Sequence, residues 1–407
     1  MNLTIVIVVL LLASFVFERV LDRLNSKSWD LKLPESLSDL YKADEYEKAQ
    51  RYDQEKDRLS MWSSAFSLLL MITLVYSRSF AWLLNYVSGI TTDLMFQTIL
   101  FFGIFALLSD LLQLPFSIYS TFVIEEKFGF NRTTPKTFIL DKFKGYLLAA
   151  TLGGSVIALF VLFYQYAGSS FWWIAWVSIS GFSLLISMFY ASVILPIFNK
   201  LSPLPQGELR DALTAYCKKV NFPVSDLFVM DGSKRSSKAN AFFSGLGPKK
   251  KIVLFDTLIE KHSVNELVAV MAHEVGHYKK KHTFTMIGIS ILQTGLMMFI
   301  LGKFINTPDL SIALGAEKAA LPLGLIAFFL LYSPVSMFLS IGMNMLSRKH
   351  EYEADNFASE TANASDLVNA LKKLSKDSLS NLNPHPAYVF VYYSHPTLLQ
   401  RMNNMHH

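Results

Sequence analysis

The sequence has one cysteine, Cys217, among 407 residues, and only 17% of its residues are charged. A single cysteine excludes an internal disulfide and a zinc cluster built from several cysteines. The basic-aromatic motifs of DNA- and RNA-binding modules are also missing, so the net charge of +5 gives no reason to expect a nucleic-acid partner. We find no internal repeat and no low-complexity linker.

Long apolar runs are what the sequence has in excess, because 52% of its residues are hydrophobic. Seven runs are each near the roughly 20 residues that cross a bilayer. They cover residues 3–18, 61–77, 96–118, 146–166, 172–198, 284–302 and 320–346. The first run has no basic stretch before it and no small-residue cleavage site after it, so we expect a retained span. The pattern predicts a mainly α polytopic membrane protein with seven transmembrane helices.

Lysine and arginine are unevenly distributed between the connections. Of the 37 in the chain, 34 lie in the segments 19–60, 120–145, 199–283 and 347–407. Basic connections tend to stay in the cytoplasm. We therefore expect the N-terminus outside and the large polar segments and the C-terminus in the cytoplasm, at the inner membrane of a bacterium or the endoplasmic reticulum of a eukaryote.

The same pattern divides the chain into helices one to five with their loops (1–198), a polar region (199–283), helices six and seven (284–346) and a polar C-terminal region (347–407). Alternating charge in 33–58 predicts a solvated helix before the second span. In the polar region, "GELRDALTAYCKKVNF" predicts an amphipathic helix. The short runs "DLFVMD" (226–231), "NAFFSG" (240–245) and "KIVLFDTL" (251–258) predict strands of a small sheet.

The motif "HEVGH" at 273–277 is the first candidate for chemistry. His273 and His277 are four residues apart and share one helix face, so both can bind a single ion. Glu274 lies about 100° round the axis, where it can reach a water on that ion without being a ligand. Catalytic zinc sites use three protein ligands and leave a position for water. The alternative is a pair of histidines that only pack in a polar turn.

Ser263 and Glu266 have the spacing of a capping box, which predicts where the "HEVGH" helix begins. A third ligand is expected in "SRKHEYEADNFASE" (347–360), which should continue the helix of the seventh span. Glu351 and Asp355 share one face, whereas Glu353 points elsewhere. We predict Glu351 as the third zinc ligand and Asp355 as the acceptor for a ligand histidine N–H.

The alternative for this segment is a solvated acidic helix whose carboxylates pair with Arg348 and Lys349. Three further histidines have no spacing that assigns them a role: His282, His350 and His385.

These motifs resemble the type I CAAX prenyl protease family of integral-membrane zinc metallopeptidases. "HEVGH" and "EYEADNFA" flank a hydrophobic span, and five further segments resemble family blocks in family order: "LPESLSDLYKADEYEKAQRY", "FVIEEKFGFNRTTPKTFILDKFKG", "LPIFNKLSPLPQGELRDAL", "NAFFSGLGPKKKIVLFDTL" and "SHPTLLQRM". The resemblance implies seven transmembrane helices forming an α-barrel around a water-filled chamber. A cytoplasmic zinc metallopeptidase domain with a small β-sheet would cap it and hold one Zn²⁺ per chain. Asp110 and Gln113 would face the chamber or pair between helices.

The resemblance also implies roles for individual residues. Glu274 would be the general base, and His395 would donate to the oxyanion with Arg401 as a supporting charge. Thr397 stands where the family commonly has a second proline, which leaves the loop geometry around His395 open. Asn240 and Ala241 resemble the start of a substrate-binding edge strand that holds an extended peptide by strand addition.

The expected function is hydrolysis of peptide bonds near the C-terminus of prenylated CAAX-type or other membrane-associated proteins, by a monomer surrounded by membrane lipid. The short connection 303–319 favours a bacterial protein, for which quality control of membrane proteins is the expected duty. The alternative from another class is a polytopic transporter or lipid-binding protein with a structural zinc, which needs no base at Glu274.

Overall fold

The computed structural model of the chain describes residues 2–29, 37–38, 40–244 and 250–405. Within these residues, seven helices are long and apolar enough to cross a membrane: Leu3–Ser28, Ala43–Tyr76, Leu94–Glu125, Pro135–Tyr166, Gly168–Phe198, His282–Phe304 and Leu321–Thr361. Each predicted run matches one of them, and no run extends past its helix by more than one residue. The prediction of seven membrane helices is confirmed. Of the charged segment 33–58, residues 33–36 and 39 lie outside the described residues.

The helices are longer than the apolar runs because their charged ends extend them. The first three are α1 (Leu3–Ser28), α2 (Ala43–Tyr76) and α4 (Leu94–Tyr119), and a π-helical segment continues α4 to Glu125. The fourth joins α5 (Pro135–Leu148) to α6 (Gly154–Tyr166) and the fifth joins α7 (Phe171–Phe189) to α8 (Leu195–Phe198), each through a π-helical turn. The last two are α12 (His282–Phe304) and α14 (Leu321–Thr361).

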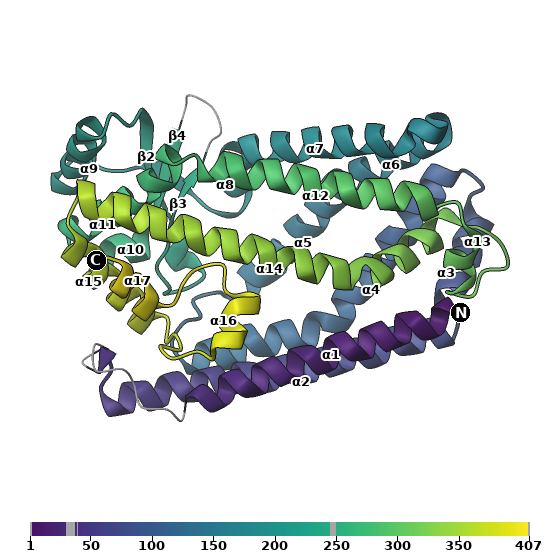
Figure 1. The fold of residues 1–407 in the computed structure, drawn as a ribbon, viewed down its shortest axis with the longest axis horizontal. Helices are drawn as coiled ribbons and strands as arrows, with labels where there is room; N and C mark the ends of the chain where they lie inside the picture. The colour runs from purple at the N-terminus through teal and green to yellow at the C-terminus, as the bar shows by residue number, and fades with distance from the viewer. Residues whose placement is uncertain (1, 30–36, 39, 245–249, 406–407) are drawn as a thin grey trace.

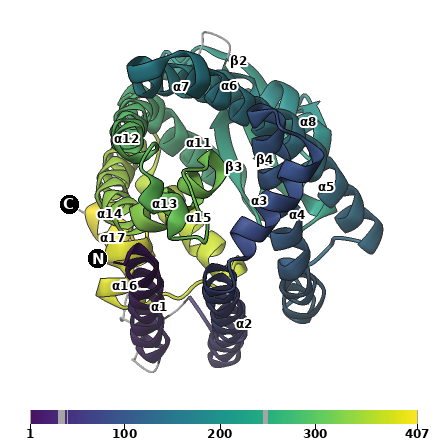
Figure 2. The same cartoon turned by 90° about the vertical axis from the view of Figure 1, so that its right-hand side faces the viewer.

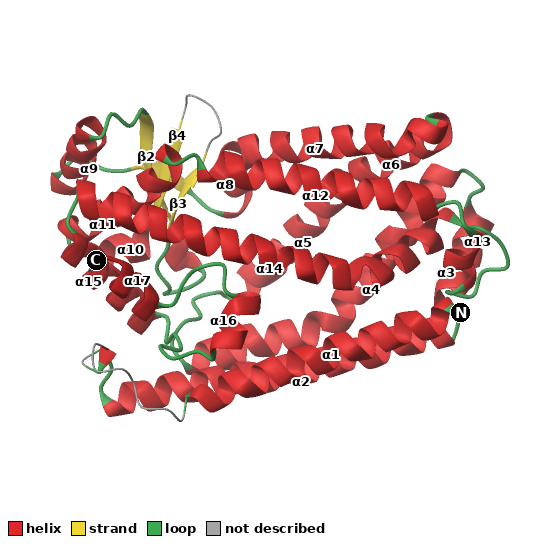
Figure 3. Cartoon of the chain, in the orientation of Figure 1, coloured by secondary structure: helices red, strands yellow, loops and turns green. Residues whose placement is uncertain are grey.

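The long helices form a ring with the sheet at one end. They run along the long axis of the molecule in Figure 1, and in the end view of Figure 2 α1, α2, α4, α7, α12 and α14 surround a common centre. The strands gather at one end of the ring (Figure 3). At the other end lie two short helices that the sequence analysis did not predict, α3 (Ser79–Ile90) and α13 (Pro308–Ile312).

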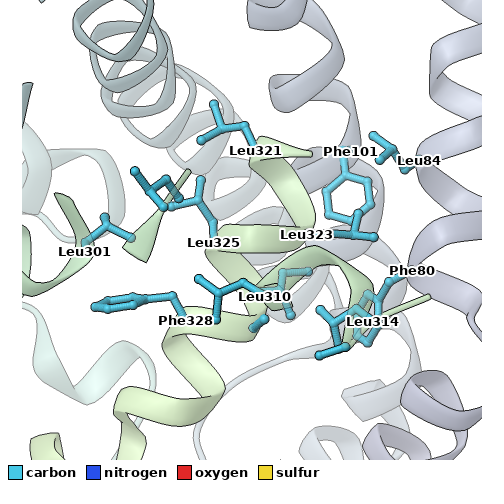
Figure 4. Close-up of a cluster of buried hydrophobic side chains, with 14 of the residues drawn as sticks. Phe80, Leu84, Phe101, Leu301, Leu310, Leu314, Leu321, Leu323, Leu325 and Phe328 are labelled. Atoms are coloured by element: carbon cyan, nitrogen blue, oxygen red, sulfur yellow. The ribbon is translucent and has the colours of Figure 1, made fainter. Parts of the chain in front are cut away.

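A buried hydrophobic cluster packs the end of the ring remote from the sheet (Figure 4). Its members include Phe80, Phe101, Leu301, Leu310, Leu321 and Phe328, from α3, α4, α12, α13 and α14, and others come from α1, α2, α6 and α7. Membrane lipid is as apolar as these side chains, so close packing rather than removal from water provides their stabilisation. The cluster therefore anchors the ends of α12 and α14 relative to each other.

Polar groups inside the spans pair between helices. The carboxylate of Asp110 on α4 accepts hydrogen bonds from Lys142 Nζ at 2.7 Å and Tyr146 Oη at 2.6 Å, both on α5. Gln113 bonds two serine hydroxyls of α2, at 2.7 and 3.0 Å. Of the two alternatives left open by the sequence, the structure therefore supports pairing between helices for Asp110 and Gln113.

A four-stranded sheet has the order β1 (Leu201–Pro203), β2 (Val224–Met230), β4 (Lys250–Phe255), β3 (Ala241–Ser244). Strands β2 and β4 are parallel, and the other two pairs are antiparallel. Because β3 is the last strand in this order, it is an edge strand. The predicted strand 251–258 is wrong at its end, because Asp256 begins α10 (Asp256–Lys261) and its Oδ1 accepts from Thr257 N at 2.8 Å. The three-residue β1 was not predicted, and residue 245 of the predicted strand 240–245 lies outside the described residues.

The predicted helices of the polar region are confirmed as α9 (Glu208–Lys219) and α11 (Val264–Lys279). The capping box also forms, with Ser263 N donating to Glu266 Oε2 at 2.9 Å and Glu266 N donating to Ser263 Oγ at 3.3 Å. Three helices follow α14: α15 (Ala364–Asp377), α16 (Pro386–Tyr392) and α17 (Leu398–Met405). Apolar residues of α9, α11, α14 and α15 share one core with β2 and β4.

Helix α14 connects the membrane region with the polar domain. It has 41 residues, which at 1.5 Å per residue is roughly 60 Å, about twice the thickness of a bilayer core. Its apolar first part lies in the ring, and its second part carries Glu351 and Asp355 against α11. The prediction that the seventh span continues as one helix is confirmed.

Candidate metal centre and active site

Three side chains from α11 and α14 converge on one point. Among the described residues, His273, His277 and Glu351 each offer a ligand atom, and these atoms lie within 4.8 Å of one another. The two histidine Nε2 atoms are 3.1 Å apart. Glu351 places Oε2 3.4 Å from His273 Nε2 and Oε1 3.3 Å from His277 Nε2. Two nitrogens and a carboxylate from two helices thus face a common centre.

A buried carboxylate orients the first of these rings. His273 Nδ1 lies 2.9 Å from Asp355 Oδ1. An ionised carboxylate only accepts, so Nδ1 carries the proton and the lone pair of Nε2 faces Glu351. Arg401 Nη2, 3.2 Å from the same Nδ1, is a second donor and cannot bond it. Arg401 instead binds Asp355 through Nε at 2.8 Å and Nη2 at 2.6 Å.

The charges around His273 favour a cation at this position. Burial lowers the pKa of His273, as does Arg401, but the two carboxylates of Asp355 and Glu351 together outweigh both effects and raise it to about 9. Burial also lowers the pKa of Arg401, but the hydrogen bonds with Asp355 together with the negative charges of Asp355, Glu351 and Glu274 outweigh burial and raise it. The carboxylates that favour a proton on the ring favour a metal ion for the same electrostatic reason.

The side chains fit a metal of the zinc type. Glu351 is 3% exposed and Asp355 0%, so the alternative of a solvated acidic helix is wrong. Within the described part of the chain, the buried Glu351 Oε2 accepts no hydrogen bond of good geometry. Such an orphan acceptor beside two imidazole lone pairs calls for a positive charge. Two imidazoles and one carboxylate are a ligand set used by catalytic zinc sites.

The predicted oxyanion residues lie beside Glu351. His395 Nδ1 is 2.9 Å from Glu351 Oε2, and its side chain is 65% exposed. Arg401 Nη1 is 3.6 Å from the same oxygen. The Arg401 guanidinium thus lies between Glu351 and Asp355, whereas the ring of His395 is largely exposed.

The loop that carries His395 is held from both sides. Asn344 Nδ2 on α14 donates to Val391 O of α16 at 2.8 Å. On the other side, Thr397 Oγ1 accepts from Gln400 N at 3.3 Å, and Thr397 N donates to Gln400 Oε1 at 2.9 Å. These reciprocal bonds have the pattern of a capping box at the start of α17. Thr397 therefore begins this helix without the proline common in the resembling family.

Asn240 and Ala241 lie at the start of the edge strand β3. Asn240 is exposed, its carbonyl accepts from Phe255 N at 3.1 Å, and its Oδ1 accepts from Ala241 N at 2.8 Å. The next residue, Phe242, lines a cavity of about 550 Å³ together with Glu274, His277 and residues of α7, α12 and α14. Glu274 thus faces a space bordered by an edge strand and by membrane helices.

Two family models together match nearly the whole chain. The model described as "CAAX prenyl protease N-terminal, five membrane helices" matches residues 24–200, and the model "Peptidase family M48" matches residues 203–407. The chain belongs to the CAAX prenyl protease family of M48 peptidases. It is a membrane metallopeptidase, and the alternative of a transporter with a structural zinc is set aside.

Relatives of this M48 peptidase are similar over nearly their full length. The CAAX prenyl protease 1 homolog of Oryza sativa subsp. japonica is 35% identical, with 96% of this chain and 94% of the relative covered. CAAX prenyl protease 1 of Saccharomyces cerevisiae is 34% identical, with 96% and 92% covered. The crystal structure of S. mikatae Ste24p superimposes with a TM-score of 0.93 at 32% identity, covering 100% of this chain and 99% of that chain.

The M48 peptidase has two histidines beside its candidate metal centre to which the sequence analysis assigned no role. His282 Nδ1 lies 3.0 Å from His277 Nδ1, and His282 Nε2 lies 2.8 Å from Glu353 Oε2. His350 stacks on the His282 ring with centroids 4.0 Å apart. Helical spacing could not reveal these contacts, because α11 ends before α12 begins and Lys281, between the two helices, has a φ of 60°. The third unassigned histidine, His385, accepts from Ala387 N at 3.2 Å at the start of α16.

The glycine of "HEVGH" is where α11 and α14 approach closely. A Cβ added to Gly276 would lie 3.0 Å from Ala354 Cα and 3.1 Å from its carbonyl oxygen. Backbone atoms cannot move aside as a flexible side chain can. Glycine is therefore required here to bring His273 and His277 within reach of Glu351.

We expect Gly276→Ala to lower the free energy of unfolding by about 1–3 kcal/mol, as overpacking does in other tight interfaces, and to reduce bound metal. Thermal unfolding in detergent and metal analysis measure both effects. The matched control is Gly288→Ala on α12, where an added Cβ meets nothing within 4 Å. Equal behaviour of the two variants would contradict the packing argument.

Proposed function

We propose that this metallopeptidase is a zinc endopeptidase that cleaves near the C-terminus of membrane-associated substrates of the prenylated CAAX type. The observation that carries this proposal is the cavity that brings Glu274 and His277 together with α7 and α12. A peptide delivered from the membrane would meet the metal centre there. The printed names of the relatives, CAAX prenyl proteases, agree with such a substrate.

His273, His277 and Glu351 would hold the zinc, with Asp355 keeping the proton on His273 Nδ1. Bound zinc supplies a polarised carbonyl and a water of lowered pKa. Glu274 would take a proton from the attacking water on its carboxylate and pass it to the nitrogen of the leaving amine. His395 donates a hydrogen bond to the substrate oxygen as negative charge develops on it.

The substrate backbone would lie extended beside β3. An edge strand has unpaired N–H and C=O groups that a peptide can match, and Asn240 and Ala241 stand where that edge begins. The cavity beyond has apolar side chains, among them Leu184, Met286 and Ile291, together with serine and threonine hydroxyls. It therefore offers contacts both to an apolar group and to a peptide.

The decisive experiment compares a farnesylated CAAX peptide with its unprenylated twin, using purified protein of measured zinc content. We expect one zinc per chain, activity that a chelator removes and zinc restores, and at least a tenfold preference in kcat/KM, equivalent to about 1.4 kcal/mol. Equal cleavage of both peptides would contradict the proposed preference for prenylated substrates and favour a quality-control protease with the same chemistry.

We further propose that the metal centre faces the cytoplasm and that one chain is sufficient for activity. The lysine and arginine distribution supports the orientation, and the ligand set, complete within one chain, supports a monomer. Expressed in a eukaryotic membrane, the native sequons at Asn131 and Asn363 should remain unglycosylated. Glycosylation of either asparagine would show that the opposite orientation is correct. The mass of the active detergent-solubilised particle tests the monomer.

A further inference from the structure

The two ligand histidines are held in different ways. His273 donates a hydrogen bond from Nδ1 to Asp355, a carboxylate that is fully buried and bound by Arg401. The other ring, His277, contacts no carboxylate through its Nδ1 among the described residues. Its Nδ1 faces a second imidazole, His282, whose far nitrogen reaches Glu353. This asymmetry requires an explanation, because an unsupported imidazole can present either nitrogen to a metal.

We propose that His282 and Glu353 form a relay of positioning residues that sets the tautomer and orientation of His277. The proposal rests on the proposed zinc site and adds to it a support for the second ligand. A chain of donors and acceptors carries it: the Glu353 carboxylate, the two nitrogens of His282 and the two nitrogens of His277.

One proton assignment satisfies the whole chain. Ionised Glu353 only accepts, so His282 Nε2, 2.8 Å from it, carries a proton. His282 Nδ1 in the neutral ring is then an acceptor. The contact of 3.0 Å between the two Nδ1 atoms requires His277 Nδ1 to donate. His277 Nε2 is left with its lone pair, 3.1 Å from His273 Nε2 and directed at the metal position.

The surroundings hold the relay in place. His282 is 3% exposed and stacks against His350, with an interplanar angle of 9° and centroids 4.0 Å apart. Stacking fixes the plane of the His282 ring and therefore the direction of both its nitrogens. The Glu353 side chain is 38% exposed, and Lys349 Nζ lies 3.9 Å from its Oε1. The relay is thus rigid at His282 and open to water at Glu353.

The relay also borders the substrate space. His277, His282 and His350 all line the cavity of about 550 Å³ that contains Glu274. Asp355, by contrast, is 0% exposed. We therefore expect loss of the relay to weaken the bond between the metal and His277, while His273 stays oriented by Asp355.

The test is the affinity of the full-length protein for Zn²⁺, measured by competition with a chelating dye, together with the visible spectrum of the Co²⁺ form. His282→Phe keeps a stacked ring but removes both nitrogens, and we expect it to weaken zinc binding ten- to a hundredfold, as loss of an outer hydrogen-bond partner does elsewhere. Glu353→Ala should weaken binding by less, about tenfold, because Glu353 is partly exposed.

Glu353→Gln keeps an acceptor for His282 and should bind zinc within about threefold of the parent, which separates the hydrogen bond from the charge. Lys349→Ala is the matched control and should change neither affinity nor spectrum. Unchanged affinity in Glu353→Ala overturns the relay. The relay is also overturned if His282→Phe binds zinc as tightly as the parent while its zinc-free form unfolds at a lower temperature. That result would show a structural role only. A parent that binds no zinc would instead refute the proposed function.

Discussion

Replacing Glu274 by glutamine is expected to lower kcat for peptide cleavage by at least a hundredfold while leaving zinc bound. General bases contribute roughly 10²- to 10⁴-fold, and an amide cannot take the proton from water. The side chain lines the cavity beside His277 but does not belong to the converging ligand group. The measurement is single-turnover cleavage with parallel metal analysis.

Glu260→Gln is the control for the Glu274 variant, since Glu260 is an exposed glutamate of α10. It should cleave at the parental rate. Cleavage by Glu274→Gln at that rate would exclude Glu274 as the base. Loss of zinc from the variant would indicate that Glu274 holds the metal rather than a proton.

Asp355→Ala is expected to lower the free energy of unfolding by about 3–5 kcal/mol even in zinc-free protein, because it leaves a buried cation without its partner. Asp355 is 0% exposed, and the Arg401 side chain is 12% exposed. Equilibrium unfolding in mixed micelles with a chelator present measures this change in the free energy of unfolding without a contribution from metal binding. The double variant with Arg401→Met should recover part of the loss.

The chain offers a matched pair for this experiment. Arg235 binds Asp141 with the same two-pronged geometry, at 2.7 and 2.9 Å, but the two side chains are 23% and 24% exposed. Asp141→Ala should therefore cost less than Asp355→Ala, since water can solvate the remaining arginine. Equal losses in the two variants would show that burial does not control the effect at Asp355.

Local patterns predicted those parts of the candidate site that lie within one helix. The spacing of His273 and His277 and the capping box at Ser263 are properties of a single segment, and an α-helix brings residues four apart together wherever it forms. The seven spans were predictable because the bilayer sets their length and apolar character. Glu351 was predictable as a carboxylate on one face, although its burial was not.

Contacts between distant segments could not be predicted from the sequence. The His282 ring reaches His277 because α12 starts after a left-handed turn at Lys281, and Glu353 reaches His282 across 71 residues of chain. Similarly, the strand predicted to end at residue 258 ends at Phe255, since Asp256 bonds the backbone N–H of Ser233 at 2.8 Å. Short apolar runs do not show where such a partner will stop a strand.

The sequence by itself determined the membrane spans, the helix that carries two imidazoles and a glutamate, and the helix that carries two carboxylates, because each depends on spacing within a few turns. Only the tertiary structure decided that α11 and α14 touch at Gly276, that Asp355 and His282 support different rings, and that Glu274 faces a cavity. Those outcomes depend on how closely separate helices pack, and no periodicity along one segment encodes the distance to another.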